Sequence, residues 1–131
     1  MKKVVVENLK YRYPLTENLA LNGISFEIEK GEFIGVVGRN LAGKSTLCQA
    51  LVGLVPHFYH GAYGGKVMVD GLEVLKSAVS ELALKVGIVF QNPFTQVTGS
   101  RLTVYDEIAF GLENIGIERT EMINRIEHAL E

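Results

Sequence analysis

The sequence predicts an α/β fold in which short apolar strands alternate with helices and a glycine-rich loop joins one strand to one helix. Three observations carry this prediction. Residues 32–37 and 86–90 are short, nearly unbroken apolar runs, which are typical of strands buried on both faces of a parallel sheet. The glycine-rich segment Gly38–Thr46 follows the first run directly. From Thr103 onward, apolar residues recur at helical spacing.

Other strands are expected on either side of the glycine-rich segment. Residues 4–9 alternate weakly between two faces, which predicts a first strand that ends near Tyr13–Pro14. Residues 24–28 alternate cleanly between apolar and polar side chains, which is typical of a strand with one exposed face. Residues 67–69 form another apolar run, and the pair Asp70–Gly71 that follows it favours a tight turn.

Two helices are expected near the end of the sequence. Thr103 and Asp106 fit an N-terminal capping box, and Gly116 occupies the position of a helix C-cap. A second helix is expected to begin near Thr120, and its apolar pattern continues to Glu131 without a stop signal. On this pattern we expect the chain to be truncated, the front part of a longer protein.

Composition narrows the class of protein. The net charge of -2 argues against nucleic acid as the main partner, because a surface that follows phosphates needs a basic excess. No apolar run approaches the roughly 20 residues of a membrane span. The single cysteine, Cys48, excludes an internal disulfide and fits a reducing compartment, and its place after the loop favours a small buried side chain over a reactive thiol. We therefore expect a cytoplasmic protein.

The glycine-rich segment matches the phosphate-binding pattern G-x-x-x-x-G-K-[ST]. With a strand before it and a helix after it, successive backbone N–H groups and a helix N-terminus point at a bound anion. Lys44 would add a positive charge for the β- and γ-phosphates, and the Ser45 hydroxyl a ligand for Mg²⁺. The alternative is a chance match in an ordinary strand–turn–helix unit. The predicted nucleotide contacts are Gly38, Arg39, Asn40, Leu41, Ala42, Gly43, Lys44, Ser45 and Thr46.

The order of these motifs resembles the ATP-binding domain of ABC transporters. The resemblance covers nearly the whole chain but only the N-terminal half of that domain. It implies a P-loop NTPase core with parallel core strands and further antiparallel strands over residues 1–101, and the beginning of a helical subdomain over residues 102–131. Segments 53–57, 64–67, 91–96 and 107–114 are most similar to the energy-coupling-factor branch, which powers the uptake of vitamins and of metals such as cobalt and nickel.

The resemblance gives roles to two residues outside the loop. Tyr13 matches the aromatic residue that stacks on adenine, and the alternative is an ordinary aromatic residue at a strand end. Gln91, after the second apolar run, matches a glutamine that reaches Mg²⁺ or the attacking water, and the alternative is a turn residue. Lys44 and Gln91 are therefore the candidate catalytic residues, and Ser45 and Gln91 are the candidate metal ligands.

Two positions of the loop depart from the family pattern. Leu41 stands where the family usually has glycine, and Arg39 where it often has proline. If position 41 requires a positive φ, leucine is costly there and lowers nucleotide affinity; otherwise it is only a bulkier lid. Arg39 either offsets part of such a loss with its charge or points into solvent. His57 and His60, three residues apart without a third ligand nearby, favour a polar loop over a metal site.

Several segments that complete the site in the family are absent from residues 92–131. The signature segment, the acidic strand end, the catalytic glutamate and the switch histidine all belong beyond Glu131 in the family. We therefore expect this chain to bind Mg²⁺ and ATP without hydrolysing ATP, and its parent to be an ABC-type ATPase. The absent half also includes a core strand beside the strand at 32–37, so its loss is expected to expose apolar surface.

The implied function is that of the ATP-binding subunit of an ABC-type importer, which couples ATP binding and hydrolysis to solute uptake. The expected partners are a membrane-embedded transporter subunit, docked near residues 91–102, and a second ATP-binding domain in a homo- or heterodimer. The expected location is the inner face of the cell membrane, through the partner, and no nucleic acid is expected. One alternative is a nucleotide-binding fragment without catalysis; the other is an ABC-type ATPase with a soluble task such as cluster assembly or DNA repair.

Overall fold

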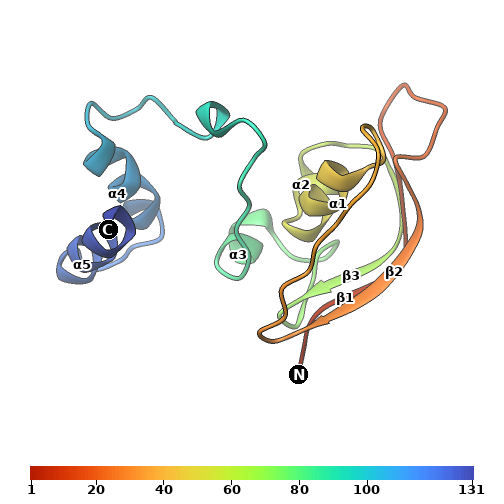
Figure 1. Cartoon of the computed structure of the whole chain (residues 1–131), viewed down its shortest axis with the longest axis horizontal. Coiled ribbons are helices and arrows are strands. Elements are labelled where there is room, and N and C mark those ends of the chain that lie inside the picture. Colours follow the sequence, from red (N-terminus) through yellow and green to blue (C-terminus); the bar gives the residue numbers. More distant parts are fainter. The chain divides into compact units, whose positions relative to one another are not determined.

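The computed structural model describes all residues, 1–131, and divides into two compact units, Met1–Ile88 and Val89–Glu131 (Figure 1). The division falls after Ile88, ahead of the boundary expected at residues 101 and 102. Residues 98–101 belong with the second unit because they bond to the helix that follows them. The Thr98 N–H donates to the Glu107 carboxylate, and Arg101 forms an ion pair with Glu113. The assignment of residues 102–131 to a helical subdomain stays a prediction.

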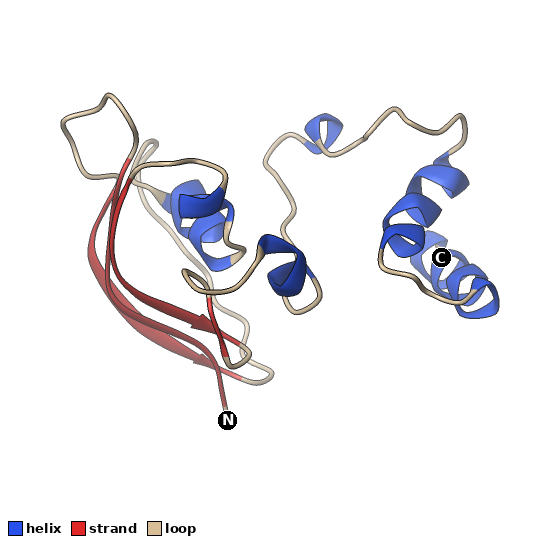
Figure 2. Ribbon diagram, turned by 180° about the vertical axis from the view of Figure 1, so that it is seen from behind, coloured by secondary structure: helices blue, strands red, loops and turns tan.

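Unit 1 is a curved antiparallel sheet with helices against its concave face (Figures 1 and 2). The strand order is β2-β1-β3-β4, so β1 and β3 are central and every pair is antiparallel. The elements of the unit are β1 (Lys2–Arg12), β2 (Leu21–Glu29), α1 (Lys44–Leu51), α2 (Leu54–His57), β3 (Ala62–Val69), β4 (Leu72–Glu73) and α3 (Val79–Ala83). The expected strands over residues 4–9, 24–28 and 67–69 are all formed.

A bulge in the central strand β1 decides which of its side chains face the helices. The register of β1 shifts against both neighbours between Val6 and Lys10, and Asn8 takes a positive φ of 47° there. One extra residue reverses the side-chain alternation of a strand. Val6, Leu9 and Tyr11 are therefore the buried residues of β1, which explains why the alternation over residues 4–9 is weak. After the shift, Tyr11 near the end of β1 is buried in the core.

The core of unit 1 lies between the sheet and the helices. Val6, Leu9 and Tyr11 pack there with residues of β2, α1, α2, β3, α3 and the segment after β4; the other buried members are Leu21, Leu47, Ala50, Val55, Val67, Val69, Val74 and Leu82. The predicted turn at Asp70–Gly71 joins β3 to β4, and both residues have positive φ, at 46° and 85°, as a type I′ turn requires. Lys3 and Lys85 flank the Asp70 carboxylate, and hydrogen bonds from both lysines lower its pKa.

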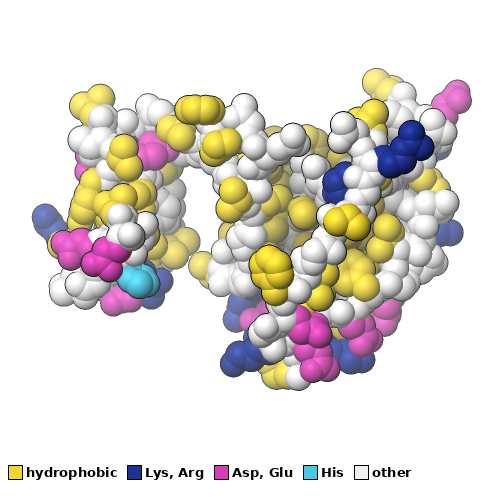
Figure 3. Space-filling model, in the orientation of Figure 1, with side chains coloured by type: hydrophobic (Ala, Val, Ile, Leu, Met, Phe, Trp, Pro, Cys, Tyr) yellow, Lys and Arg dark blue, Asp and Glu magenta, His cyan; other side chains and the backbone are white.

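The two parallel core strands expected at residues 32–37 and 86–90 are not formed. The structure assigns no strand to either segment, and the sheet consists of β1 to β4 alone. A parallel strand obtains its neighbours through crossover connections, so an apolar run alone does not make one. The apolar side chains of residues 32–37 consequently stay exposed, with Phe33 at 100% and Val37 at 94%. In the second segment Val86 is half-buried and packs against the core of unit 1, whereas Val89 is exposed. Hydrophobic side chains gather on the face of unit 1 seen in Figure 3.

Unit 2 contains a short 3-10 helix, η1 (Pro93–Thr95), and a pair of packed helices, α4 (Val104–Asn114) and α5 (Arg119–Leu130). The predicted start of α4 is confirmed, because Thr103 Oγ1 accepts a hydrogen bond from the Asp106 N–H at 3.1 Å. Its predicted stop is confirmed as well: Gly116 has a φ of 74°, and its N–H donates to the Glu113 carbonyl. Ile126 is buried between the helices. None of the helices is long and apolar enough to cross a membrane.

Candidate functional site

The glycine-rich segment ends where α1 begins, and Gly43 makes that junction possible. Gly43 is the N-cap of α1 with a φ of 97°, a conformation that side chains disfavour. A Cβ at this position would lie 2.3 Å from the Ala20 carbonyl oxygen, which is closer than any real contact. A Cβ on Gly38, in contrast, would meet Ala42 at an ordinary 3.4 Å. The second glycine of the pattern is therefore required by the fold of this chain itself.

The first turn of α1 is open toward a ligand. No side chain caps its N-terminus, and no acidic residue lies in its first turn. The first amides of a helix have no partner within the helix, and the helix dipole adds positive potential at that end. The side chain of Ser45, in this turn, is exposed. The predicted phosphate contacts thus lie at a helix end whose chemistry suits an anion.

Lys44 reaches back over the glycine-rich segment. Its Nζ donates to the Gly38 carbonyl at 2.8 Å and to the Arg39 carbonyl at 2.8 Å. An ammonium group has three N–H donors, so one donor stays available when these two bonds are made. The positive charge is therefore held directly above the backbone turn that the pattern assigns to phosphate.

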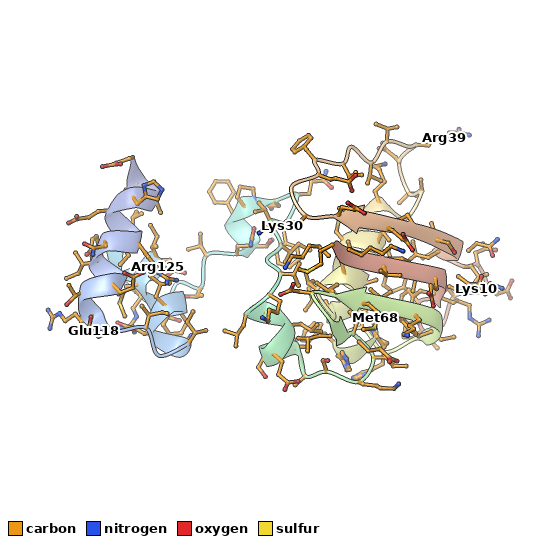
Figure 4. The ribbon with its side chains drawn as sticks, turned by 90° about the horizontal axis from the view of Figure 1, so that it is seen from below. Lys10, Lys30, Arg39, Met68, Glu118 and Arg125 are labelled. Atoms are coloured by element: carbon orange, nitrogen blue, oxygen red, sulfur yellow. The ribbon has the colours of Figure 1, made fainter.

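Leu41 adopts the left-handed conformation that the family glycine would adopt easily. Its φ is 66°, and its side chain is fully exposed at 103%. Because a leucine in this region costs roughly 1–2 kcal/mol, position 41 is a source of strain in this loop. The alternative that Leu41 is merely bulky does not describe this backbone. Arg39 is exposed and extends from the loop away from the sheet, as Figure 4 shows.

Tyr13 lies against α1, close to the phosphate-binding turn. Its hydroxyl lies 2.9 Å from Thr46 Oγ1 and donates to Gln49 Oε1 at 3.2 Å. Its ring makes edge contacts with two other tyrosines, at centroid distances of 4.9 Å for Tyr11 and 6.4 Å for Tyr59. The structure thus brings Tyr13 and the start of α1 together, although 33 residues separate Tyr13 from Thr46. Stacking of Tyr13 on adenine stays a prediction.

Two other sequence predictions concern α1 and the following turn. Cys48 is exposed, so the expectation of a small buried side chain is wrong. The buried face of α1 carries Thr46, Leu47 and Ala50, and Cys48 lies off that face. His57 Nε2 bonds to the Val74 carbonyl at 2.7 Å, which makes its N–H the donor and gives this histidine a role in holding the turn.

Gln91 belongs to unit 2, just ahead of η1, and its side chain is exposed. The next residue begins a tight local turn, in which Asn92 Oδ1 accepts from the Phe94 N–H at 3.1 Å. Its role as a metal ligand or catalytic residue beside Lys44 and Ser45 therefore stays a prediction.

Gln49 is the contact residue that the sequence did not suggest. It lies on the second turn of α1, three positions after Thr46, so both side chains share one face of the helix. The sequence contains that i,i+3 spacing, but nothing in the sequence indicates that Tyr13, the residue after β1, lies against this face.

Comparison with known proteins places these features in a family. The family model described as "ABC transporter" matches residues 21–131. A putative ABC transporter ATP-binding protein of Pyrococcus horikoshii is 48% identical over 130 residues, which are 99% of this chain and 45% of that protein. The energy-coupling factor transporter ATP-binding protein EcfA1 of Latilactobacillus sakei is 43% identical over 130 residues, 99% of this chain and 44% of that protein.

A solved structure gives the same result for the fold. The structure of cbiO1 from Clostridium perfringens, described as part of the ABC transporter complex cbiONQ, superposes with a TM-score of 0.77 at 31% identity. The match covers 98% of this chain and 49% of cbiO1. The chain thus spans about half the length of the relatives that it matches. These findings confirm the resemblance to ABC transporter ATP-binding domains and to the energy-coupling-factor branch.

Proposed function

Because the chain belongs to the ABC transporter family, we propose that it supplies the phosphate- and adenine-binding part of the ATP-binding subunit of an importer of the energy-coupling-factor type. The observation that carries this proposal is the geometry of the loop. Lys44 lies over the turn at Gly38 and Arg39, and the uncapped end of α1 lies beside it. This arrangement suits a chain of phosphates.

In the proposed complex, each part of the loop has a separate task. The amides of Gly43–Thr46 at the start of α1 bind phosphate oxygens, and the Lys44 ammonium leaves its loop carbonyls to bind the β- and γ-phosphates. Tyr13 stacks on adenine. The remaining loop residues form the turn around the phosphates.

Mg²⁺ fits the same end of α1, because a Mg²⁺ bound to nucleotide needs only one or two protein oxygens besides phosphates and water. The exposed Ser45 hydroxyl supplies one such oxygen in the first turn. The amide oxygen of Gln91 is the second proposed ligand. When bound, Mg²⁺ neutralises charge between the β- and γ-phosphates.

The activity of the whole parent protein is part of this proposal. We propose that the parent hydrolyses ATP with a second ATP-binding domain, and that it lies at the inner face of the membrane through a membrane-embedded subunit. Two observations favour a transporter over an ATPase with a soluble task. EcfA1 is named as a transporter protein and cbiO1 as part of a transporter complex. The segment proposed to dock the membrane subunit also carries exposed apolar side chains, Phe94 at 83% and Leu102 at 103%.

Nucleotide titration of Lys44→Ala tests the proposed site. We expect the 131-residue chain to bind a fluorescent ATP analogue in the presence of Mg²⁺, and Lys44→Ala to bind it at least tenfold more weakly because the phosphates lose their cation. Lys30→Ala is the matched control, since it removes an exposed lysine outside the loop. Equal affinity of Lys44→Ala and the unmodified chain would overturn the assignment of the loop.

A phosphate-release assay tests the expected lack of catalysis. Residues 92–131 contain no signature segment and no catalytic glutamate of the family type. We therefore expect the chain to bind ATP without turnover above background. Sustained phosphate release that survives purification and disappears in Lys44→Ala would show that this chain has a complete site.

A further inference from the structure

Two hydrogen bonds fix the end of the Tyr13 side chain on α1. Its hydroxyl donates to Gln49 Oε1 at 3.2 Å and lies 2.9 Å from Thr46 Oγ1. A tyrosine hydroxyl has a single proton, and the bond to Gln49 uses it. The Thr46 hydroxyl is therefore the donor in the second contact. A directed chain of bonds runs from Thr46 through Tyr13 to Gln49.

The aromatic ring of Tyr13 is also held by contacts with two other tyrosines. Tyr11 and Tyr59 contact it in edge-to-face geometry, with interplanar angles of 82° and 74°. Tyr11 is itself fixed, because it is buried and its hydroxyl donates to the Tyr59 carbonyl at 2.7 Å. The neighbouring tyrosines thus limit sliding of the ring, while Gln49 and Thr46 limit its rotation about the side-chain bonds.

The location of Gln49 separates it from the phosphates. It is half-buried on the second turn of α1, whereas the first turn presents the anion-binding amides. Thr46 lies in the first turn and is itself a proposed nucleotide contact, so a change there would act on both functions. The bond from Tyr13 to Gln49 Oε1 links Gln49 to the proposed site.

We propose that Gln49 is a positioning residue of the base-binding side of this site: its side-chain oxygen holds the Tyr13 hydroxyl and thereby orients the ring that receives the nucleobase. This inference rests on the proposed function. A ring held before the ligand arrives loses less freedom on binding, and that pre-organisation favours affinity. The effect of Gln49 should therefore depend on whether the ligand carries a base.

The test compares two ligands of the unmodified chain and its variants by calorimetry, both with Mg²⁺: ATP, and inorganic tripolyphosphate, which has the phosphates without the base. A hydrogen bond of ordinary strength corresponds to about a three- to tenfold change in affinity. We expect Gln49→Leu and Tyr13→Phe each to weaken ATP binding by about that factor and to change tripolyphosphate binding less than twofold. Gln49→Glu keeps an oxygen acceptor and should keep ATP affinity within about twofold of the unmodified chain.

Two further variants make the test specific. Gln49 and Tyr13 act through one bond, so the double variant Tyr13→Phe/Gln49→Leu should lose no more ATP affinity than the weaker-binding single variant. Cys48→Ala changes the exposed residue that precedes Gln49 on α1, and it should leave the affinities for ATP and tripolyphosphate unchanged. Thermal melting of each variant shows whether the unit is folded at the titration temperature, and Gln49→Glu provides a folded comparison if Gln49→Leu is unstable.

The outcomes separate this inference from the proposed function. If the unmodified chain binds ATP and Gln49→Leu binds it equally well, the positioning role is overturned while the nucleotide site stands. Equal losses for ATP and tripolyphosphate, or additive losses in the double variant, would also overturn it, because Gln49 would then support α1 in general. If the unmodified chain binds neither ligand, the proposed function itself is overturned.

Discussion

The strands of the antiparallel sheet in unit 1 and the segment at residues 32–37 are both rich in apolar residues, but they differ in structure. Val6 and Val67 are buried at 2% and 1% exposure, whereas Val37 and Phe33, equally suited to a strand, are exposed at 94% and 100%. The sheet strands have partners within the same unit: β1 pairs with both β2 and β3. The segment at residues 32–37 has none.

This difference teaches that an apolar run needs its neighbours before it becomes a strand. The glycine-rich loop has the described turn although the strand expected before it is not formed. The turn of the loop is held from α1 by Lys44 and from the end of the β1–β2 connection by the close approach of Gly43 to Ala20. We therefore expect the two regions to respond differently to equivalent substitutions.

The largest difference should come from truncating one apolar side chain in each region. Leu9→Ala empties a fully buried position in the central strand and should lower the free energy of unfolding by about 2–5 kcal/mol. Phe33→Ala removes a larger side chain that is fully exposed, and it should change the free energy of unfolding by less than about 0.5 kcal/mol. Urea unfolding followed by circular dichroism measures both. Similar losses in the two variants would show that residues 32–37 are packed in solution.

A pair of glycine substitutions tests the support of the loop with a smaller expected effect. Gly43→Ala places a Cβ against the Ala20 carbonyl at a φ of 97°, and we expect a loss of about 2 kcal/mol or more together with weaker nucleotide binding. A Cβ at position 35 would have no neighbouring atom within 4 Å, so Gly35→Ala should leave stability and nucleotide binding nearly unchanged. Thermal melting and nucleotide titration of both variants provide the comparison. A Gly43→Ala chain as stable as Gly35→Ala would mean that the loop is not held against Ala20.

The smallest effect is expected at Leu41, inside the loop. Glycine and asparagine populate the left-handed region more readily than leucine, so Leu41→Gly and Leu41→Asn should tighten nucleotide binding by about two- to tenfold. Leu41→Ala removes the bulk of the side chain but keeps the Cβ, and it should leave the affinity near that of the unmodified chain. If Leu41→Ala tightens binding as much as Leu41→Gly, the size of the leucine matters and the backbone strain does not.

The elements that the sequence predicts correctly are those with local signals. The alternation over residues 24–28, the turn at Asp70–Gly71, and the ends of α4 at Thr103 and Gly116 each depend on neighbours within a few residues. The loop pattern predicts the open end of α1 for the same reason. These features need no knowledge of distant parts of the chain.

The features that the sequence does not predict depend on distant contacts. Residues 32–37 and 86–90 have the composition of core strands, but composition does not tell whether a parallel partner is present. The bulge at Asn8 reverses the faces of β1 and so directs Tyr11 inward, which weak alternation could not show. The contact between Tyr13 and Gln49 spans 36 residues and became visible only in the folded unit.

Hydrogen–deuterium exchange of this chain, with and without Mg²⁺ and ATP, tests the central claim most directly, because it reports each region separately. Without nucleotide, amides of β1 and β3 should exchange slowly and those of residues 33–37 quickly, as expected for paired and unpaired backbone. Saturating nucleotide should slow exchange over residues 38–49 and leave β3 unchanged. Exchange over residues 38–49 that does not change at saturating nucleotide would contradict the assignment of this loop as the nucleotide site.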